Sequence, residues 1–341
     1  MEISIVLIGT IIAVALIFDF INGFHDAANS IATIVATRVL SPVKAVLWGA
    51  FFNFSAIFIV GTGVAKTVGS GLIDLKFVTP EVILAGLIGA ITWNLLTWWW
   101  KLPSSSSHTL IGGYAGAALT HVTLIHALPN SFDILVAEGW IKTIAFVFIA
   151  PVVGMLLAYG LMIINAWLFH KADGPKTDKW FRGAQLVSSA FMSISHGGND
   201  AQKTAGIITT VLLSAGYLQH FEVPMWVLWA AYIAMGLGTL SGGWRIVHTM
   251  SRKLTHLKPS GGFCAETAAA LSIMLATELK LPISTTHVIT GAITGVGAIQ
   301  RLKAVRWNLA TRILWTWALT IPASAAIAAI AMLIVAQFNL R

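Results

Sequence analysis

Two short acidic motifs in this chain contain residue types that can handle ions. Residues 24–30 read Phe-His-Asp-Ala-Ala-Asn-Ser and residues 198–204 read Gly-Asn-Asp-Ala-Gln-Lys-Thr, so Asp26 and Asp200 hold equivalent places. A carboxylate at membrane depth is costly and persists where it binds a cation or carries a proton. We therefore predict a cation or proton site at Asp26 and Asp200, with capping of the following helix as the alternative.

Two hydroxyl-rich motifs recur in the same order. Residues 102–109 read Leu-Pro-Ser-Ser-Ser-Ser-His-Thr, and residues 281–288 read Leu-Pro-Ile-Ser-Thr-Thr-His-Val. Proline suits the first turn of a helix, and a helix N-terminus offers free N–H groups and partial positive charge to an anion. The motifs predict a shared site for a tetrahedral oxyanion, with helix capping or helix–helix hydrogen bonding as the alternative. The candidate anion ligands are Ser105, Ser106, Ser107, Ser284, Thr285 and Thr286.

Other polar side chains lie in or near these motifs. His25 is next to Asp26, where it could change charge near neutral pH and pass a proton. Lys203 takes the place of Asn29 in the second acidic motif. A lysine at membrane depth needs a partner, either an acid or the anion. Glu266 opens an apolar stretch and is either an interfacial or a functional residue.

The composition predicts that these motifs lie in a membrane. Hydrophobic residues make up 57% of the 341 and charged residues 10%, against about 25% charged in soluble domains. Several apolar blocks approach or exceed the roughly 20 residues that cross a hydrocarbon core. The fold expected is an all-α integral membrane protein with about 10–12 transmembrane segments. Ten are expected near residues 4–36, 45–65, 81–100, 104–122, 140–169, 183–217, 224–242, 261–279, 283–300 and 313–336.

Two of these segments are too long for one straight crossing. At 1.5 Å per residue the stretch 4–36 would span about 50 Å, well beyond a hydrocarbon core of about 30 Å, and the stretch 183–217 has the same problem. Each contains a polar run with glycine, Gly23 in the first and Gly197 and Gly198 in the second. We predict that both are broken into two pieces joined by unwound backbone that lines a cavity.

The positions of lysine and arginine predict the orientation. If the N-terminus is outside, the inward loops carry most of the 21 basic residues, with many in 170–182 and 243–260. Positive side chains favour the cytoplasmic side of a membrane. Both termini are therefore expected outside, and the loop 170–182 in the cytoplasm.

The order of the motifs predicts an inverted repeat. Five expected crossings separate each motif from its second copy, and an odd number turns that copy upside down. Inverted-topology repeats are typical of secondary transporters with a shared site near the bilayer midplane. The expected organisation is a first repeat over 1–169, a cytoplasmic linker over 170–182 and a second repeat over 183–341, with broken or re-entrant helices.

On these motifs the chain resembles the PiT family of inorganic phosphate transporters over nearly its whole length. The motifs that carry the resemblance are residues 22–29, 102–109, 195–203 and 281–287. The resemblance implies a secondary transporter that imports phosphate with a cation gradient, forms a homodimer and has both termini outside. It assigns ion and phosphate handling to Asp26, Asn29, Asn199 and Asp200, and phosphate binding to the hydroxyl motifs. With the residues argued above, the candidates for the coupling ion are Asn22, His25, Asp26, Asn199 and Asp200, and those for phosphate are Asn29, Lys203 and the hydroxyl motifs.

One departure from the family pattern concerns the coupling ion. Many members, including sodium-coupled ones, have Gly-Ala-Asn-Asp at the first motif, whereas residues 23–26 read Gly-Phe-His-Asp. This variant resembles the bacterial low-affinity branch of the inner membrane, in which uptake is proton-coupled and a neutral metal–phosphate complex is a candidate substrate. It favours H⁺ over Na⁺. The family also has a sulfate-carrying branch, so sulfate is the alternative anion.

Several other classes are disfavoured. The chain has no Gly-x-Ser-x-Gly turn, His-Glu-x-x-His pair or phosphate-binding Gly-Lys-Ser, so neither an enzyme nor an ATP-driven pump is expected. Its single cysteine, Cys264, excludes an internal disulfide and a cysteine-based metal cluster. We expect no cofactor and no nucleic-acid partner, and an inverted repeat disfavours a channel. A cytoplasmic accessory protein on the basic loops is left open.

Overall fold

The computed structural model describes residues 5–125, 131–300 and 305–339, which contain helices and no named strand. The all-α prediction is therefore confirmed. The helices are α1 (Ile5–His25), α2 (Ala27–Ala36), α3 (Pro42–Ser55), α4 (Gly63–Ser70), α5 (Pro80–Trp99), α6 (Ser106–Ile125), α7 (Ala137–Leu168), α8 (Gly174–Ser214), α9 (Met225–Ser241), α10 (Trp244–Thr249), α11 (Pro259–Glu278), α12 (Thr285–Gln300) and α13 (Trp307–Asn339).

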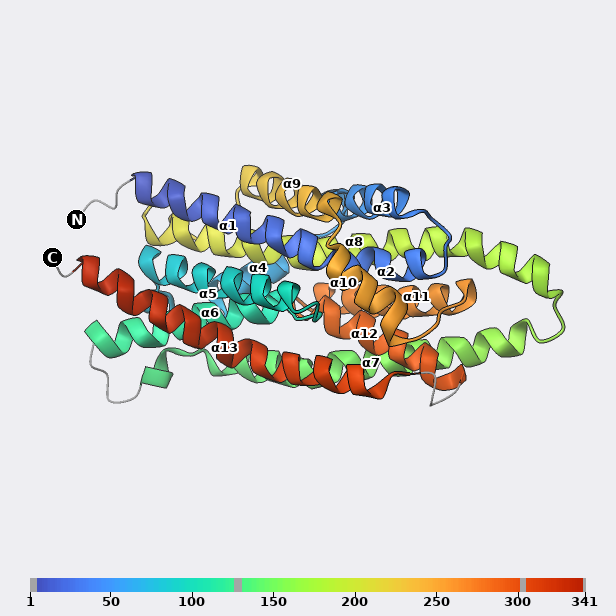
Figure 1. The fold of residues 1–341 in the computed structure, drawn as a ribbon. Coiled ribbons are helices and arrows are strands. Elements are labelled where there is room, and N and C mark those ends of the chain that lie inside the picture. Colours follow the sequence, from blue (N-terminus) through green and yellow to red (C-terminus); the bar gives the residue numbers. More distant parts are fainter. Residues whose placement is uncertain (1–4, 126–130, 301–304, 340–341) are drawn as a thin grey trace.

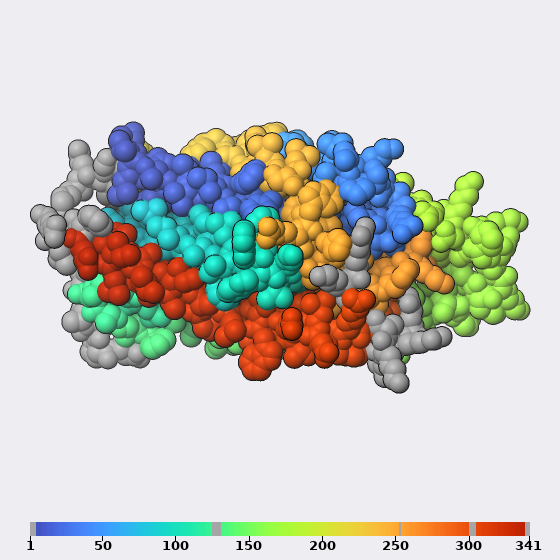
Figure 2. All heavy atoms as spheres, in the orientation of Figure 1, coloured from blue at the N-terminus to red at the C-terminus, as the bar shows by residue number. Residues whose placement is uncertain are grey.

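Long apolar helices identify a membrane-embedded protein. Among the described residues, the helical stretches with the length and apolarity of a membrane span are Ile5–Ala36, Pro80–Trp99, Ala137–Leu168 and Trp307–Gln337. The pair α3 and α4, bent by 86°, is a further candidate. Figure 2 shows the elongated body, with α13 running along much of this face.

Four of the expected crossings pair into two helical hairpins. The limbs α5 and α6 pack together, as do α11 and α12. In Figure 1 the two hairpins extend towards the middle of the molecule from opposite ends. The stretches 81–100, 104–122, 261–279 and 283–300 are therefore limbs of two hairpins, and the first of them, Pro80–Trp99, also has the length and apolarity of a membrane span.

The first limb of each hairpin ends in the same way. Lys101 (φ 63°) and Lys280 (φ 61°) both adopt the left-handed backbone conformation. The N–H group of the following residue donates to the carbonyl oxygen five positions earlier, at 3.0 Å for Leu102 and 2.8 Å for Leu281. This is the Schellman pattern that ends many helices. The chain therefore reverses at equivalent points, immediately before the two hydroxyl motifs.

The two predicted helix breaks turn out differently. Only Asp26 separates α1 from α2, so the interruption is one residue rather than an unwound segment. α8 is a continuous helix of 41 residues, and the predicted break within 183–217 is wrong. Its glycines allow close packing instead of unwinding: a Cβ on Gly197 would lie 2.3 Å from the carbonyl oxygen of Asn53 in α3.

The two ends of the molecule differ. The start of α1 and the end of α13 lie at one end and the turn between α7 and α8 lies at the other (Figure 1). Most of the stretch 170–182, predicted as a linker, is helical because α8 begins at Gly174. The first turns of α8 carry the exposed ion pair of Arg182 with Asp178 (3.0 Å). These polar turns explain a helix about 60 Å long, because they do not need an apolar environment.

Glycines fix each hairpin against a long helix. A Cβ on Gly116 of α6 would lie 2.3 Å from a carbonyl oxygen of α13, and one on Gly295 of α12 would lie 2.3 Å from a carbonyl oxygen of α7. Gly112 and Gly291, one turn earlier, approach the same two helices similarly closely. Small residues four apart let membrane helices pack backbone to backbone. The hairpin tips are thereby held by the long helices.

Substitution of Gly295 by leucine is expected to push α12 away from α7 and lower the unfolding temperature. Overpacking of a tight contact costs about 1–3 kcal/mol. Gly160 of α7 is the matched control, because a Cβ there would meet no atom within 4 Å, and Gly160→Leu should leave the unfolding temperature unchanged. Thermal unfolding of the purified protein in detergent measures both. Equal melting of the two variants would contradict the packing role of Gly295.

Candidate ion and anion site

The tips of the two hairpins meet inside the protein. The hydroxyl of Ser107, in the first turn of α6, donates to the carbonyl oxygen of Ile283 at 3.1 Å. The rings of His108 and His287 lie edge to face, with centroids 4.7 Å apart. All four residues are buried. The structure thus brings together the N-terminal ends of α6 and α12 and, with them, the two hydroxyl motifs.

Asp26 lies between α1 and α2 with both carboxylate oxygens engaged. Its Oδ1 is 2.8 Å from Nδ1 of His25, and its Oδ2 accepts a hydrogen bond from the hydroxyl of Thr286 at 3.4 Å. The side chain makes no capping hydrogen bond to α2. The capping alternative is therefore wrong for Asp26, whose carboxylate contacts the tip of the second hairpin.

Asp200 lies in the middle of α8, where a residue cannot cap the helix. Its Oδ1 accepts a hydrogen bond from Nζ of Lys203 at 2.5 Å. Its Oδ2 accepts one from the hydroxyl of Thr285 at 3.1 Å and lies 3.3 Å from Nε2 of His196. Residues three and four apart share one face of a helix. The continuity of α8 therefore aligns the imidazole, the carboxylate and the ammonium group.

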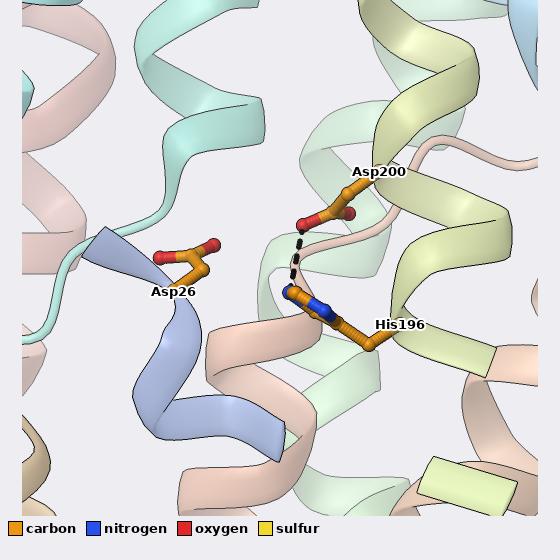
Figure 3. Close-up of side chains that lie close together, drawn as sticks. All are labelled: Asp26, His196 and Asp200. Atoms are coloured by element: carbon orange, nitrogen blue, oxygen red, sulfur yellow. Dashed lines mark ion pairs between the residues drawn. The ribbon is translucent and has the colours of Figure 1, made fainter. Parts of the chain in front are cut away.

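A cluster of three ligating side chains joins the two halves of the chain. Figure 3 shows Asp26, His196 and Asp200 directed towards one another, with Asp26 on a different element from the other two. Each side chain offers one ligand atom, and these atoms lie within 4.8 Å of one another. Two carboxylates and an imidazole can hold a cation or share a proton. The cluster is buried throughout.

Lys203 and Asn29, equivalent residues of the two acidic motifs, both contact the hairpin tips. Besides its carboxylate partner, the Lys203 ammonium donates to the hydroxyl of Ser107 in the first hairpin and to the carbonyl oxygen of Ile283 in the second at 2.8 Å. The Asn29 amide donates to the hydroxyls of Thr286 (2.9 Å) and Thr285 (3.3 Å) in the second hairpin. Both side chains are buried. They therefore connect the acidic motifs to the hydroxyl motifs.

Ser105 and Ser284 cap the helices that follow them. Their Oγ atoms accept hydrogen bonds from the backbone N–H groups of His108 and His287, both at 3.2 Å, as N-cap residues do. The capping alternative therefore holds for these two serines. The hydroxyl of Ser106, by contrast, is buried and has no hydrogen-bond partner. It is available to a ligand.

Asn22 and Asn199 have partners outside the acid cluster. The Asn199 amide donates to the hydroxyl of Thr277 at 2.8 Å, which ties α8 to the second hairpin. The Asn22 amide lies 3.5 Å from Oδ1 of Asp19. His25, which contacts Asp26, is also 3.2 Å from the hydroxyl of Thr97 at the end of α5. The side-chain amides of these two asparagines therefore form their hydrogen bonds outside the acid cluster, whereas the backbone oxygen of Asn22 accepts from the N–H group of Asp26 at 2.8 Å.

Glu266 is part of a buried polar network rather than an interfacial residue. Its carboxylate accepts hydrogen bonds from Thr33 of α2 at 2.5 Å and from two residues of α8, Gln185 at 2.9 Å and Ser188 at 2.5 Å. Its side chain is fully buried. The interfacial alternative is therefore wrong, and the network joins α11 to α2 and α8.

Sequence reasoning missed Asp19 and left His196 out of the ion site. Both are fully buried. Helical spacing was the signal that could have found His196, which precedes Asp200 by four residues and so shares its helix face. Asp19 precedes Asp26 by seven residues, about two helical turns. The expected break in 183–217 concealed the first relationship.

Comparison with known proteins agrees with this geometry. A model of the phosphate transporter family matches residues 22–328, which include both acidic and both hydroxyl motifs. The chain belongs to the phosphate transporter family. Members of this family are transporters, so the expectation that the protein is not an enzyme is confirmed.

Similar proteins cover nearly the whole chain. A protein of Rhizobium meliloti (strain 1021), described as a probable low-affinity inorganic phosphate transporter, is 53% identical over 94% of each chain. One of Bacillus subtilis (strain 168) with the same description is 43% identical over 98% of each chain. A solved structure titled the sodium-dependent phosphate transporter is 25% identical, with a TM-score of 0.86 over 96% of this chain and 99% of that one. The helix arrangement is thus that of a known phosphate transporter.

Substitution of Lys203 by methionine is expected to destabilise the protein, because it leaves Asp200 buried without its cationic partner. Removal of one member of a buried ion pair costs about 3–5 kcal/mol. Adding Asp200→Asn to Lys203→Met should recover part of this loss. Thermal unfolding measures the change. Lys142→Met, which removes the exposed pair with Glu138, is the control and should have little effect; an equal effect of both lysine substitutions would contradict the prediction.

Proposed function

We propose that this protein imports inorganic phosphate across a bacterial cell membrane together with a cation. The observation that carries the proposal is the meeting of two helix N-termini beside Lys203 and the cluster of Asp26, His196 and Asp200. A helix N-terminus suits a tetrahedral oxyanion because its N–H groups are free and the helix dipole is positive there. The descriptions of the relatives as low-affinity phosphate transporters support phosphate as the anion.

The proposed phosphate ligands come from both hairpins and both acidic motifs. Ser105 and Ser284 shape the helix ends by capping them, so their neighbours are the direct ligands. The free hydroxyl of Ser106 supports this assignment. The proposed set is Ser106, Ser107, Thr285 and Thr286, with Asn29 and Lys203.

The ion pair of Lys203 with Asp200 explains why a cation must accompany phosphate. The Lys203 ammonium group cannot form a direct ion pair with phosphate while it is paired with the Asp200 carboxylate at 2.5 Å. A cation or proton on Asp200 would neutralise this carboxylate, release Lys203 and Thr285, and reduce the repulsion between acid and anion. Binding of the cation therefore strengthens binding of the anion, and the anion strengthens binding of the cation by the same factor.

We favour H⁺ over Na⁺ as the coupling ion. His25 and His196 each lie against a carboxylate, at 2.8 Å from Asp26 and 3.3 Å from Asp200. Histidine gains and loses a proton near neutral pH, whereas hard cations prefer oxygen ligands. Sodium is the alternative, because the similar solved structure is titled sodium-dependent.

A divalent metal that enters with phosphate is a further element of the proposal. The cluster of Asp26, His196 and Asp200 has the carboxylate and imidazole ligands of a divalent site. The metal would then be cargo that reduces the charge of the phosphate it accompanies.

Alternating access between two inverted repeats is the proposed transport cycle. The opposite directions of the hairpins in Figure 1 support repeats over 1–169 and 183–341 that rock around the shared site. The basic residues at the α7–α8 end support an orientation with both termini outside. A homodimer, and an accessory protein on the cytoplasmic loops, are parts of the proposal that rest on the family resemblance and on charge.

Phosphate is favoured over sulfate by the acids that border the anion ligands. Near neutral pH phosphate keeps a hydroxyl that can donate a hydrogen bond, and sulfate does not. The carboxylates of Asp26 and Asp200 are acceptors at the hydroxyl motif of the second hairpin. A site that accepts a hydrogen bond from its substrate rejects an analogue without the donor.

Purified protein in liposomes is expected to accumulate labelled phosphate when an inward proton gradient is imposed, and much less with a sodium gradient alone. Asp26→Asn and Asp200→Asn should abolish this uptake, because neither amide can take up a proton or replace the charge of the carboxylate. Omission of divalent cations separates transport of the free anion from transport of a metal complex.

The matched control is Glu138→Gln, the same chemical change at an exposed acid of α7, which should leave uptake unchanged. Normal transport by both aspartate variants would disprove the cation site. Accumulation driven by sodium alone would replace the proton with Na⁺ in the proposal.

Sulfate is expected to compete poorly with labelled phosphate, and arsenate to compete well, because arsenate keeps the donor hydroxyl. Half-maximal inhibition should need at least about 100-fold more sulfate than arsenate. Inhibition of uptake in the same liposomes measures this ratio. Equal inhibition by the two anions would favour the sulfate alternative.

A further inference from the structure

A third buried acid, Asp19, lies on α1 outside the ion and anion site. Its side chain is fully buried. It precedes Asp26, the residue that follows α1, by seven residues, which is about two helical turns or 10 Å along the axis. In Figure 1 α1 runs from the end with the termini towards the middle of the molecule. Asp19 therefore lies between that end and the acid cluster.

The Asp19 carboxylate is buried almost without partners. The Asn22 amide approaches Oδ1 at 3.5 Å, the outer limit of a hydrogen bond, and Oδ2 has no hydrogen-bond partner. Thr204 of α8 lies beside the carboxylate as a second neutral hydrogen-bonding side chain, although its hydroxyl is outside ideal hydrogen-bond geometry. Within the described parts of the chain, no basic side chain forms an ion pair with Asp19.

The charged groups around Asp19 leave it without a dedicated counter-ion. Lys203 and Asp200 of α8 are the nearby charges, and they are bound to each other at 2.5 Å. Tyr232 of α9 also faces Asp19. α5 packs on α1 and has Glu81, in its first turn, as its one charged residue; α2 has no ionisable side chain. A lone ionised carboxylate is strongly disfavoured in such surroundings, whereas the neutral acid is tolerated.

We propose that Asp19 is the proton carrier of transport, which receives a proton from the end of the protein that holds the chain termini and passes it to the acid cluster. This inference rests on the proposed proton-coupled import of phosphate. In the first step the carboxylate binds one proton and becomes neutral. In the second it gives that proton to the carboxylate of Asp26 or Asp200, so one proton enters, one leaves and no other bond changes.

The two halves of the chain differ at the position of Asp19, and this difference supports a proton route on one side of the membrane. Ser193 precedes Asp200 by seven residues and so holds in α8 the position that Asp19 holds in α1. Its hydroxyl donates to the carbonyl oxygen of Ser189 at 2.9 Å and so has a local partner. The acids Asp26 and Asp200 are matched between the halves, whereas Asp19 is not. A route through Asp19 therefore serves only the side of the membrane that α1 faces.

Two transport assays on the same liposomes test the proposal. Exchange of labelled phosphate for unlabelled phosphate at equal pH needs no net movement of protons, whereas accumulation under an inward pH gradient does. We expect Asp19→Asn to exchange phosphate like the original protein and to lose all stimulation by the pH gradient. Asp19→Glu, which keeps a proton-binding group, should retain the stimulation with an altered pH profile. Ser193→Ala, the matched control in the other half, should retain both activities.

Each other outcome decides a specific point. A normal response of Asp19→Asn to the pH gradient would overturn the proposal, and so would loss of exchange in a variant that still binds phosphate. If Asp19→Asn does not fold, an unchanged pH profile of Asp19→Glu would overturn it. Absence of phosphate exchange in the original protein would instead refute the proposed function. Exchange by that protein without any response to pH would refute the proton carrier and leave phosphate transport intact.

Discussion

The pairing of Asp200 with Lys203 inside the membrane is the interaction on which the site depends. Charges at this depth persist only when they are compensated, and this pair is completed by hydroxyls from both hairpins, Ser107 on Lys203 and Thr285 on Asp200. The pair therefore holds the two hairpin tips and α8 at one point. A change in the charge of this carboxylate therefore reaches both hairpins at once.

The scaffold makes this interaction possible by placing the hairpin tips accurately. Matching left-handed residues end the first limbs, matching serines cap the second limbs, and glycines press α6 against α13 and α12 against α7. These contacts bring the N-terminal ends of α6 and α12 together inside the protein. The polar network of Glu266 adds a second connection, between the second hairpin and the helices α2 and α8.

Glycine explains where prediction from the sequence succeeded and where it failed. Gly197 and Gly198 in a polar run predicted unwound backbone, but a Cβ on Gly197 would collide with α3, so helix packing is the reason for a glycine there. Residue spacing alone does not distinguish a glycine that bends a helix from one that admits a neighbour. The length of the stretch 183–217 also wrongly predicted a break. The first turns of α8 extend beyond the apolar region and carry exposed charges, so the helix can be longer than the membrane is thick.

The sequence by itself determined the membrane setting, the helical fold, and the recurrence of the acidic and hydroxyl motifs, because hydropathy and motif order are properties of the linear chain. Only the tertiary structure decided that four expected crossings are hairpin limbs, that Ser105 and Ser284 cap helices, and that His196 joins Asp26 and Asp200. Those outcomes depend on which surfaces pack together. Distances between segments far apart in the chain are set by that packing and have no local signal in the sequence.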